Sequence, residues 1–436
     1  MKTIINRYNI LPVSTKNILT GLFLTTLVFL LYGKTISFNY CIDDQYYLWL
    51  LPNDLSNFSE VLQSITKRFW GEQFRPTTYI TILSEVLIFG NTPKVHHFFN
   101  LLYYSLLCFV IFLVISQLFN QKIKHASLFA FCTSLLFLLH PSHANIVASI
   151  KNREVILSLL FGLLALSSFL KYFTTNKIIY LFLSPVLLLI GVMAKKDIAT
   201  FIVIIPIIGL LQNQKLNISL RQIVLTILFI ITVSVSIALV TNNIAQPTET
   251  EFTLHAYENE FINQEIKFIN RIPYAFQILA IYEKFMVVPN GYHFYFGYNT
   301  ININWNLYSV ILFLVHFTAI CLTFYYFLKH KKHYHLVGLV WFLLAIAPFC
   351  ISFTTGYVAV RYSFIASLGF CIILNQVIFY LAAKLKTPTL IITPFIVAIC
   401  LLWSYYSFTR SLDWKDLETL YPVSYTHLTL PTKPSV

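Results

Sequence analysis

Long uninterrupted apolar runs constrain the fold of this chain more than any other feature. Residues 18–31, 201–211 and 223–240 approach or reach the roughly 20 residues that a helix needs to cross a bilayer. Hydrophobic residues make up 57% of the 436 residues and charged residues only 11%, whereas soluble domains carry about 25% charged residues. The sequence therefore predicts an all-α polytopic membrane protein.

Hydropathy along the chain predicts about 11 spans of near-bilayer length. They cover approximately residues 17–33, 97–118, 126–140, 154–170, 178–194, 198–213, 222–242, 305–328, 334–353, 362–382 and 388–406. Two long loops, 34–96 and 243–304, lie on the non-cytoplasmic side. The first contains an amphipathic stretch at 57–70 with helical spacing. In the second, residues 272–289 are apolar but carry charges at their centre, so we expect them to lie in the membrane interface.

Lysine and arginine in the short loops orient the bundle. With the N-terminus inside, the cytoplasmic segments are 1–16, 119–125, 171–177, 214–221, 329–333 and 383–387. They hold 14 of the chain's 30 Lys and Arg residues and none of its 17 Asp and Glu residues, a bias typical of cytoplasmic loops. The net charge of +13 is thus a topology signal and predicts no nucleic-acid partner. We expect a multi-pass protein of the bacterial inner (plasma) membrane, with its active face periplasmic.

The seven cysteines include no CxxC pair, and all but Cys41 lie in or at the end of apolar runs. This pattern predicts small buried side chains, with neither a disulfide framework nor a structural metal site. We predict no resident cofactor, although a divalent cation stays open as a helper of the acidic residues described next.

Polar residues gather at the outer ends of the predicted spans. Asp43 and Asp44 follow the first span, where adjacent carboxylates supply a general base and a group that orients the nucleophile or holds a cation. The alternative is a solvated turn or a helix cap. His140 and His143 are spaced i, i+3, which suits a metal or hydrogen bonds to a phosphate or sugar. Histidines of an interfacial loop are the plainer interpretation.

Charged residues occur at two further span ends. Arg153 and Glu154 open an apolar helix, where a guanidinium near lipid head groups suits a phosphate. Lys195, Lys196 and Asp197 occupy a tight turn close to the hydrocarbon, an expensive position that is typical of functional residues. Snorkelling of the lysine side chains toward water is the alternative.

Two isolated arginines, Arg75 and Arg361, also lie on the outer side. Together with Arg153 and Lys196 they are able to surround one anionic head group while the Asp43–Asp44 pair faces it. That combination suits sugar transfer from a polyprenyl-phosphate carrier. The cations hold the phosphate leaving group, and a carboxylate takes the proton of the acceptor.

At these residues the sequence resembles the membrane O-mannosyltransferases that carry TPR repeats and their bacterial relatives, of the C-type glycosyltransferase fold. The matching motifs, in chain order, are Ile42-Asp43-Asp44, Phe69-Trp70, Phe74-Arg75-Pro76-Thr77, His97-Phe-Phe-Asn100, His140-Pro-Ser-His143 with Arg153-Glu154, Lys195-Lys196-Asp197, Tyr282 to Pro289, and Arg361-Tyr362. The chain departs from the family pattern at Asn145 and Val360, where an acid is usual. These departures concern recognition of the sugar and the carrier more than the fold.

The resemblance implies a catalytic base at Asp43 or Asp44. It implies a donor phosphate and sugar site formed by Arg75, His97, His140, His143, Arg153, Glu154, Lys196, Asp197, Arg361 and Tyr362. It also implies an inverting hexosyltransferase that takes a sugar from a polyprenyl- or dolichyl-phosphate carrier. The implied acceptor is a protein Ser/Thr hydroxyl or another extracytoplasmic glycan acceptor.

The same resemblance divides the chain. Residues 1–410 form the expected transmembrane glycosyltransferase domain, and 411–422 look like a lead-in to TPR repeats. Residues 423–436 look like translated sequencing-adapter read-through, so we expect them to be an artefact.

Two other classes of function fit parts of the sequence. Coupled transporters, including flippases of lipid-linked sugars, place ionisable groups near the midplane on helices broken by Gly and Pro. Here the acids lie at span ends and the chain has only 12 glycines, which disfavours that class. A lipid-linked polysaccharide polymerase or ligase would share the same membrane face, and differs mainly in its acceptor.

Overall fold

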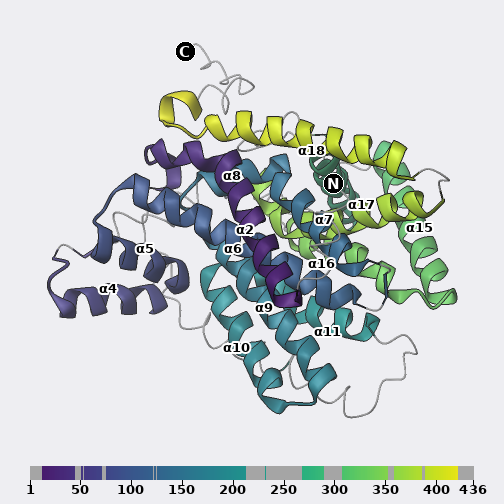
Figure 1. The fold of residues 1–436 in the computed structure, drawn as a ribbon, viewed down its shortest axis with the longest axis horizontal. Helices are drawn as coiled ribbons and strands as arrows, with labels where there is room; N and C mark the ends of the chain where they lie inside the picture. Colours follow the sequence, from purple (N-terminus) through teal and green to yellow (C-terminus); the bar gives the residue numbers. More distant parts are fainter. Residues whose placement is uncertain are drawn as a thin grey trace.

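The computed structural model describes residues 12–44, 51–52, 54–70, 75–120, 122–123, 125–212, 231, 268–288, 307–351, 358–384 and 388–420. Within these ranges the chain is helical and contains no β-sheet. The α-helices are α2 (Val13–Tyr32), α4 (Phe58–Trp70), α5 (Pro76–Phe89), α6 (Pro93–Phe119), α7 (Ala126–Leu139), α8 (Ala144–Ala148), α9 (Arg153–Thr175), α10 (Ile178–Ala194), α11 (Phe201–Leu211), α14 (Phe268–Val287), α15 (Leu307–Lys329), α16 (Leu336–Ile351), α17 (Phe364–Lys384) and α18 (Pro388–Leu412). Short 3₁₀ turns join several of them (Figure 1).

Six helical segments of the described chain are long and apolar enough to cross a membrane, and a bent helix pair raises that number to seven. They are 13–37, 93–119, 153–175, 310–329, 333–351 and 360–384, with the bent pair α7–α8 in addition. The prediction of an all-α polytopic membrane protein is therefore confirmed. The predicted number of about 11 spans stays a prediction. Helix α10 is shorter than a full span, and the span expected at 222–242 lies almost entirely outside the described residues.

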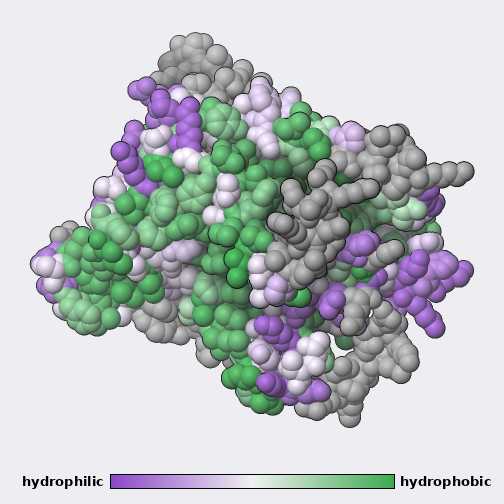
Figure 2. Space-filling model, viewed as in Figure 1, coloured by the Kyte–Doolittle hydropathy of each residue, from purple (hydrophilic) through white to green (hydrophobic). Residues whose placement is uncertain are grey.

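Hydrophobic and hydrophilic residues occupy different parts of the surface. Figure 2 shows hydrophobic residues across the middle of the molecule, with hydrophilic residues gathered toward its upper left and its lower right. Side chains such as Leu30, Phe182 and Leu401 expose more than half of their area. A soluble protein buries most of its large apolar side chains, so this exposed band fits contact with lipid.

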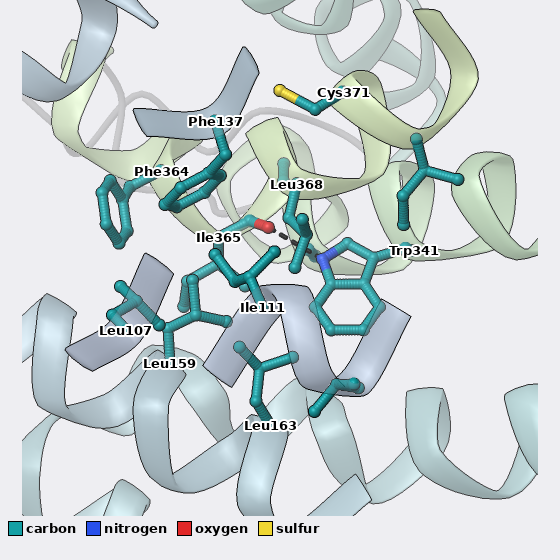
Figure 3. Close-up of a cluster of buried hydrophobic side chains, with 14 of the residues drawn as sticks. Leu107, Ile111, Phe137, Leu159, Leu163, Trp341, Phe364, Ile365, Leu368 and Cys371 are labelled. Carbon is teal, nitrogen blue, oxygen red and sulfur yellow. Dashed lines mark hydrogen bonds between the residues drawn. The ribbon is translucent and has the colours of Figure 1, made fainter. Parts of the chain in front are cut away.

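The core forms around α9, which packs against α6, α10 and α11. Figure 3 shows an apolar cluster in which Trp341 of α16 lies with side chains of α6, α7, α9 and α17. The fully buried Trp341 indole donates a hydrogen bond to the Ile365 carbonyl, 2.8 Å away. Next to it α16 and α17 cross at two glycines, where a Cβ at Gly369 would lie 2.7 Å from the Gly338 carbonyl oxygen. Small residues at such crossings allow the backbones to approach closely.

A break after α7 shapes the end of the bundle that carries most of the polar residues. Pro141 cannot continue the helix, because it lacks an N–H and restricts the residue before it to an extended backbone. His140 accordingly has ψ 124°, and the chain resumes as a 3₁₀ turn, η3 (Pro141–His143), and α8 at 54° to α7. A short turn over Ser149–Asn152 then leads directly into α9.

The segment 34–96, predicted to be an outer loop, contains more regular structure than we expected. The amphipathic stretch at 57–70 forms α4, as predicted. The following helix α5 was not predicted, because its apolar sequence lies in a segment interpreted as a loop. It begins at Pro76, the residue after Arg75, and packs on α4, α9 and α10. Figure 1 shows α4 and α5 together at one side of the molecule.

Candidate functional site

Asp44 is a buried anchor of the segment that follows α2. It lies in a 3₁₀ turn, η2 (Ile42–Asp44), and is 1% exposed. Its carboxylate accepts three hydrogen bonds, from the Cys41 N–H at 3.1 Å, the Ser149 hydroxyl at 3.0 Å and the Lys151 N–H at 2.8 Å. Burial raises the pKa of Asp44 from an ordinary value near 3.8 to about 6, against the opposing effect of these hydrogen bonds.

Asp43, in contrast to Asp44, is accessible to solvent and lies next to two cations. Its side chain is 40% exposed, and its Oδ2 atom lies 3.1 Å from the Lys151 Nζ and 3.9 Å from an Arg361 guanidinium nitrogen. The two adjacent carboxylates therefore have different surroundings. Asp44 is occupied by protein donors, whereas Asp43 combines two cations with access to solvent.

A second group of charges forms around Glu154 at the start of α9. Glu154 is fully buried and pairs with Arg75 and with Lys195, whose Nζ lies 3.1 Å from its Oε1. Lys195 also lies 3.4 Å from Asp197. Burial alone would lower the pKa of Lys195, but Asp197 and Glu154 outweigh it, so its pKa is raised and the ammonium stays charged.

The two groups are close enough to form one site. Lys151 interacts electrostatically with Glu154, and Arg361 with Lys195. We call the set the charged cluster: Asp43, Arg75, Lys151, Glu154, Lys195, Asp197 and Arg361. Its members come from five separate segments of the chain. They carry four positive and three negative charges, so an additional anion is accommodated without a large excess of one sign.

The structure differs from the sequence analysis at the tight turn after α10. Lys196 was expected in the site, and its contact with a donor stays a prediction. Its side chain is largely exposed, and desolvation together with the positive charge of Arg75 lowers its pKa. Lys195 is the lysine that turns inward, with 8% exposure. Lys151, which pairs with Asp43, was also missed. The sequence does not show which of the adjacent charged residues 195–197 points inward. It also does not show that Lys151, in the four-residue turn before α9, does so.

Arg153 is the residue before Glu154 of the charged cluster, but its side chain is buried and hydrogen-bonds to other helices. It is 0% exposed, and its guanidinium donates to the Asn100 side chain at 2.6 Å, Glu85 at 2.6 Å and the His96 carbonyl at 2.8 Å. Glu85 in turn lies 2.7 Å from a ring nitrogen of His96. This buried network joins α5, α6 and α9. In this structure the Arg153 guanidinium has protein partners, and its contact with a phosphate stays a prediction.

The three histidines of the predicted donor site are also interior residues. His143 lies 3.0 Å from the Tyr104 hydroxyl and 2.8 Å from the Ser367 hydroxyl. His140 contacts the Ser142 hydroxyl at 2.7 Å and the Met286 carbonyl at 3.2 Å. His97 is 0% exposed, with its ring edge-on to Phe38. Contact of these rings with a donor stays a prediction, and this structure shows them in packing roles.

Tyr362 supports Arg361 at the edge of the charged cluster. Its ring stacks on Phe349 at 4.6 Å with an interplanar angle of 8°, and the Arg361 guanidinium lies 5.4 Å from the ring centre. Stacking of a guanidinium on an aromatic ring restrains its direction. Arg361 is thereby held where it reaches Asp43.

No group of three or more His, Cys, Asp or Glu side chains in the described part of the chain is arranged to hold a metal ion. In that part of the chain, His140, His143 and the Asp pair are therefore not arranged as a joint metal site. All seven cysteines are free thiols in this structure, and Cys41, Cys108, Cys350 and Cys371 are buried.

The fold and the site together define a class: an all-helical multi-pass membrane protein with a cluster of cations and a solvent-accessible carboxylate where several helix ends meet. We compared the chain with protein families and with curated proteins. No protein-family model matches the chain. Curated proteins with detectable similarity are protein O-mannosyl-transferases.

The similarity is longest with the protein O-mannosyl-transferase F38B6.6 of Caenorhabditis elegans among the three relatives compared, at 23% identity over 385 residues, which is 83% of this chain and 51% of that protein. Protein O-mannosyl-transferase TMTC1 of Homo sapiens is 28% identical over 152 residues, covering 32% of this chain and 16% of the relative. Tmtc1 of Drosophila melanogaster is 23% identical over 185 residues, covering 40% and 21%. The chain thus spans about half or less of the length of these relatives.

Proposed function

We propose that this protein is a membrane glycosyltransferase that moves a sugar from a polyprenyl- or dolichyl-phosphate carrier to a protein Ser/Thr hydroxyl. One observation carries the proposal. Asp43 is an accessible carboxylate that lies between Lys151 and Arg361, with Arg75 and Lys195 in the same charged cluster. The names of the relatives make mannose the first sugar to test. The basic residues of the opposite loops favour a non-cytoplasmic active face.

The chemistry follows from the charges. Asp43 accepts the proton of the acceptor hydroxyl as the hydroxyl oxygen attacks the anomeric carbon. A bond forms between that oxygen and carbon, and the bond from the carbon to the phosphate oxygen breaks with inversion. The carrier phosphate leaves with the electron pair, and Arg361 and Lys151 stabilise the negative charge that develops on it. Asp44 holds the segment in position and does not take the proton, because its oxygens are occupied by Cys41, Ser149 and Lys151.

An apolar cavity supports the choice of a lipid carrier. It has a volume of about 470 Å³ and is lined only by apolar side chains and Cys350, from α14, α15 and α16. Cys350, which lines the cavity, is the sequence neighbour of Phe349, and the Phe349 ring stacks on Tyr362 beside Arg361. An isoprenoid chain in this cavity would therefore run from the charged cluster into the hydrophobic band.

The test is sugar transfer by the purified protein in detergent, with polyprenyl-phosphate mannose and a Ser/Thr-rich peptide. Asp43→Asn is expected to lower kcat by about 10²–10⁴-fold, the usual contribution of a general base, with an unchanged melting temperature. Asp54→Asn is the matched control, because Asp54 is an exposed acid of the same outer loop. Full activity of Asp43→Asn would remove the base assignment, and inactivity of the unmodified protein with every carrier sugar would remove the proposed function.

A further inference from the structure

We propose that the segment after α18 is a brace that holds the Asp43–Asp44 turn in its working position, with Trp414 as the principal positioning residue. The brace is residues 412–420. Its role in the reaction rests on the proposed function, whereas its contact with the turn is a property of the fold. Figure 1 shows the C-terminal end of α18 close to the segment that follows α2.

The first observation is a small apolar cluster separate from the main core. Trp414 and Leu420 are 3% and 1% exposed, and they pack with Phe38, Cys41 and Ala148. Residues 38 and 41 belong to the short connection between α2 and the Asp pair. An indole is the largest side chain that a protein can use to fill such a site, and Trp414 is the largest side chain that the brace places in this cluster.

The second observation is a hydrogen bond between the two backbones. The Asn39 N–H donates to the Lys415 carbonyl at 3.2 Å. Two further contacts lie in or next to the brace: Asp413 pairs with Arg410 of α18 at 2.7 Å, and the Asp416 carboxylate accepts the Thr419 N–H at 2.9 Å. The connection after α2 is therefore fixed to a folded segment more than 370 positions further along the chain.

The third observation joins the apolar cluster to the carboxylates. Cys41, whose side chain packs in the cluster, donates its N–H to Asp44 and accepts the Asp44 N–H at 2.9 Å. Ala148, on the other side of the cluster, precedes Ser149, whose hydroxyl donates to Asp44. The brace thus supports two of the three groups that donate hydrogen bonds to Asp44, those of Cys41 and Ser149. Asp43 is the adjacent residue.

The physical argument concerns the stiffness of the turn. Between α2 and α4 the described chain has only short 3₁₀ turns, which supply few backbone hydrogen bonds of their own. Such a segment keeps one geometry only where tertiary contacts hold it. A displacement of about 1 Å at a reacting group is sufficient to slow a reaction about 10²-fold. Loss of the brace is therefore expected to act on kcat through the position of Asp43.

The experiment uses Cys41 as a built-in reporter that does not depend on activity. The full chain in detergent is treated with N-ethylmaleimide, and the alkylation rate of each cysteine is measured by peptide mass spectrometry. Trp414→Ala is expected to raise the rate at Cys41 at least tenfold and to lower kcat at least tenfold with little change in the KM for polyprenyl-phosphate mannose. Trp414→Phe is expected to restore most of both values.

Trp403→Ala is the matched control, because Trp403 is a buried tryptophan of α18 that contacts His140 and belongs to the main core, whereas Trp414 packs with Phe38 and Cys41. It is expected to lower the melting temperature while leaving the rate at Cys41 unchanged. Leu420→Ala is the milder variant to use if Trp414→Ala does not fold. Protection of Cys41 in a folded variant without the indole would overturn the brace, and an exposed Cys41 with unchanged kcat would overturn its positioning role. If the unmodified protein transfers no sugar, the proposed function fails while the alkylation rates still decide the contact.

Discussion

At the scale of single residues, the adjacent acids Asp43 and Asp44 are chemically distinct. The sequence analysis left both as candidate bases, because neighbouring residues of the same type have the same local pattern. The structure separates them through partners that are more than 100 positions away: Ser149 and Lys151 for Asp44, Lys151 and Arg361 for Asp43. Exposure and hydrogen bonding assign the proton transfer to Asp43 in our proposal.

Asp44 also leads to a prediction about stability and pH. Its pKa is raised to about 6 in the folded protein, so between about pH 4 and pH 6 the folded state holds a proton that the unfolded state lacks. Its contribution to stability is therefore greatest below about pH 4 and is lost as the pH rises through about 6, by at most about 3 kcal/mol.

The measurement is the melting temperature in detergent between pH 4.5 and 7.5, for the unmodified protein and for Asp44→Asn. The melting temperature of the unmodified protein should fall relative to that of the variant as the pH rises. The variant also loses an acceptor for one of three buried donors, which lowers its stability by about 1–3 kcal/mol at every pH. A constant difference across this range would show that Asp44 titrates like an exposed acid.

At the scale of elements, the Arg153 network explains why α5 lies against α6 and α9. Removal of one partner of a buried ion pair leaves a buried charge and costs about 3–5 kcal/mol, whereas apolar replacement of both partners is often tolerated. Arg153→Met is therefore expected to lower the free energy of unfolding by about that amount. The double variant Arg153→Met/Glu85→Met should recover part of the loss.

Chemical denaturation and kinetics with the sugar donor distinguish a packing role of Arg153 from a role in binding the donor phosphate. In the packing role, the single variant is unstable and the KM of the folded fraction for the donor stays near that of the unmodified protein. The opposite pattern, a normal stability with a strongly raised donor KM, would return Arg153 to the phosphate site that the sequence analysis predicted.

The proposed lipid site in the cavity between α14, α15 and α16 leads to a second prediction at the scale of elements. Ala347→Trp places a large ring in a space that is lined by apolar side chains. If an isoprenoid chain occupies this space, the KM for a long-chain donor should rise at least tenfold, while a donor with one or two isoprene units is little affected. Leu402→Trp, on an exposed position of α18, is the control. Equal effects on both donors would exclude the cavity as the chain site.

At the scale of the whole molecule, the topology sets which compartment the charged cluster faces. Single cysteines at Asp54 and at Lys331 report the loop before α4 and the turn after α15. The distribution of basic residues predicts that an impermeant maleimide reaches them from opposite sides of the membrane, with Asp54 labelled from outside. Labelling of both from one side would contradict this topology, and labelling of Asp54 from the cytoplasm would invert it.

The sequence by itself determined the class of protein. Runs of apolar residues have no stable place in water, and the bilayer requires helices because it cannot satisfy open backbone groups. The same reasoning placed Asp43, Glu154, Asp197 and Arg361 near span ends and Arg75 in the first outer loop, and all five lie in the charged cluster. It missed α5, whose apolar sequence lies between charged segments and reads as loop.

Only the tertiary structure decided which side chains at those ends face each other. Lys195 and Lys196 have the same type and adjacent positions, yet one is buried beside Glu154 and the other is exposed. Arg75, Arg153 and Arg361 looked alike in sequence, and one of them is used inside the protein. The physical reason is that burial and pairing of a charge depend on partners brought by other helices. Local pattern shows where a helix ends, whereas packing determines what each end meets.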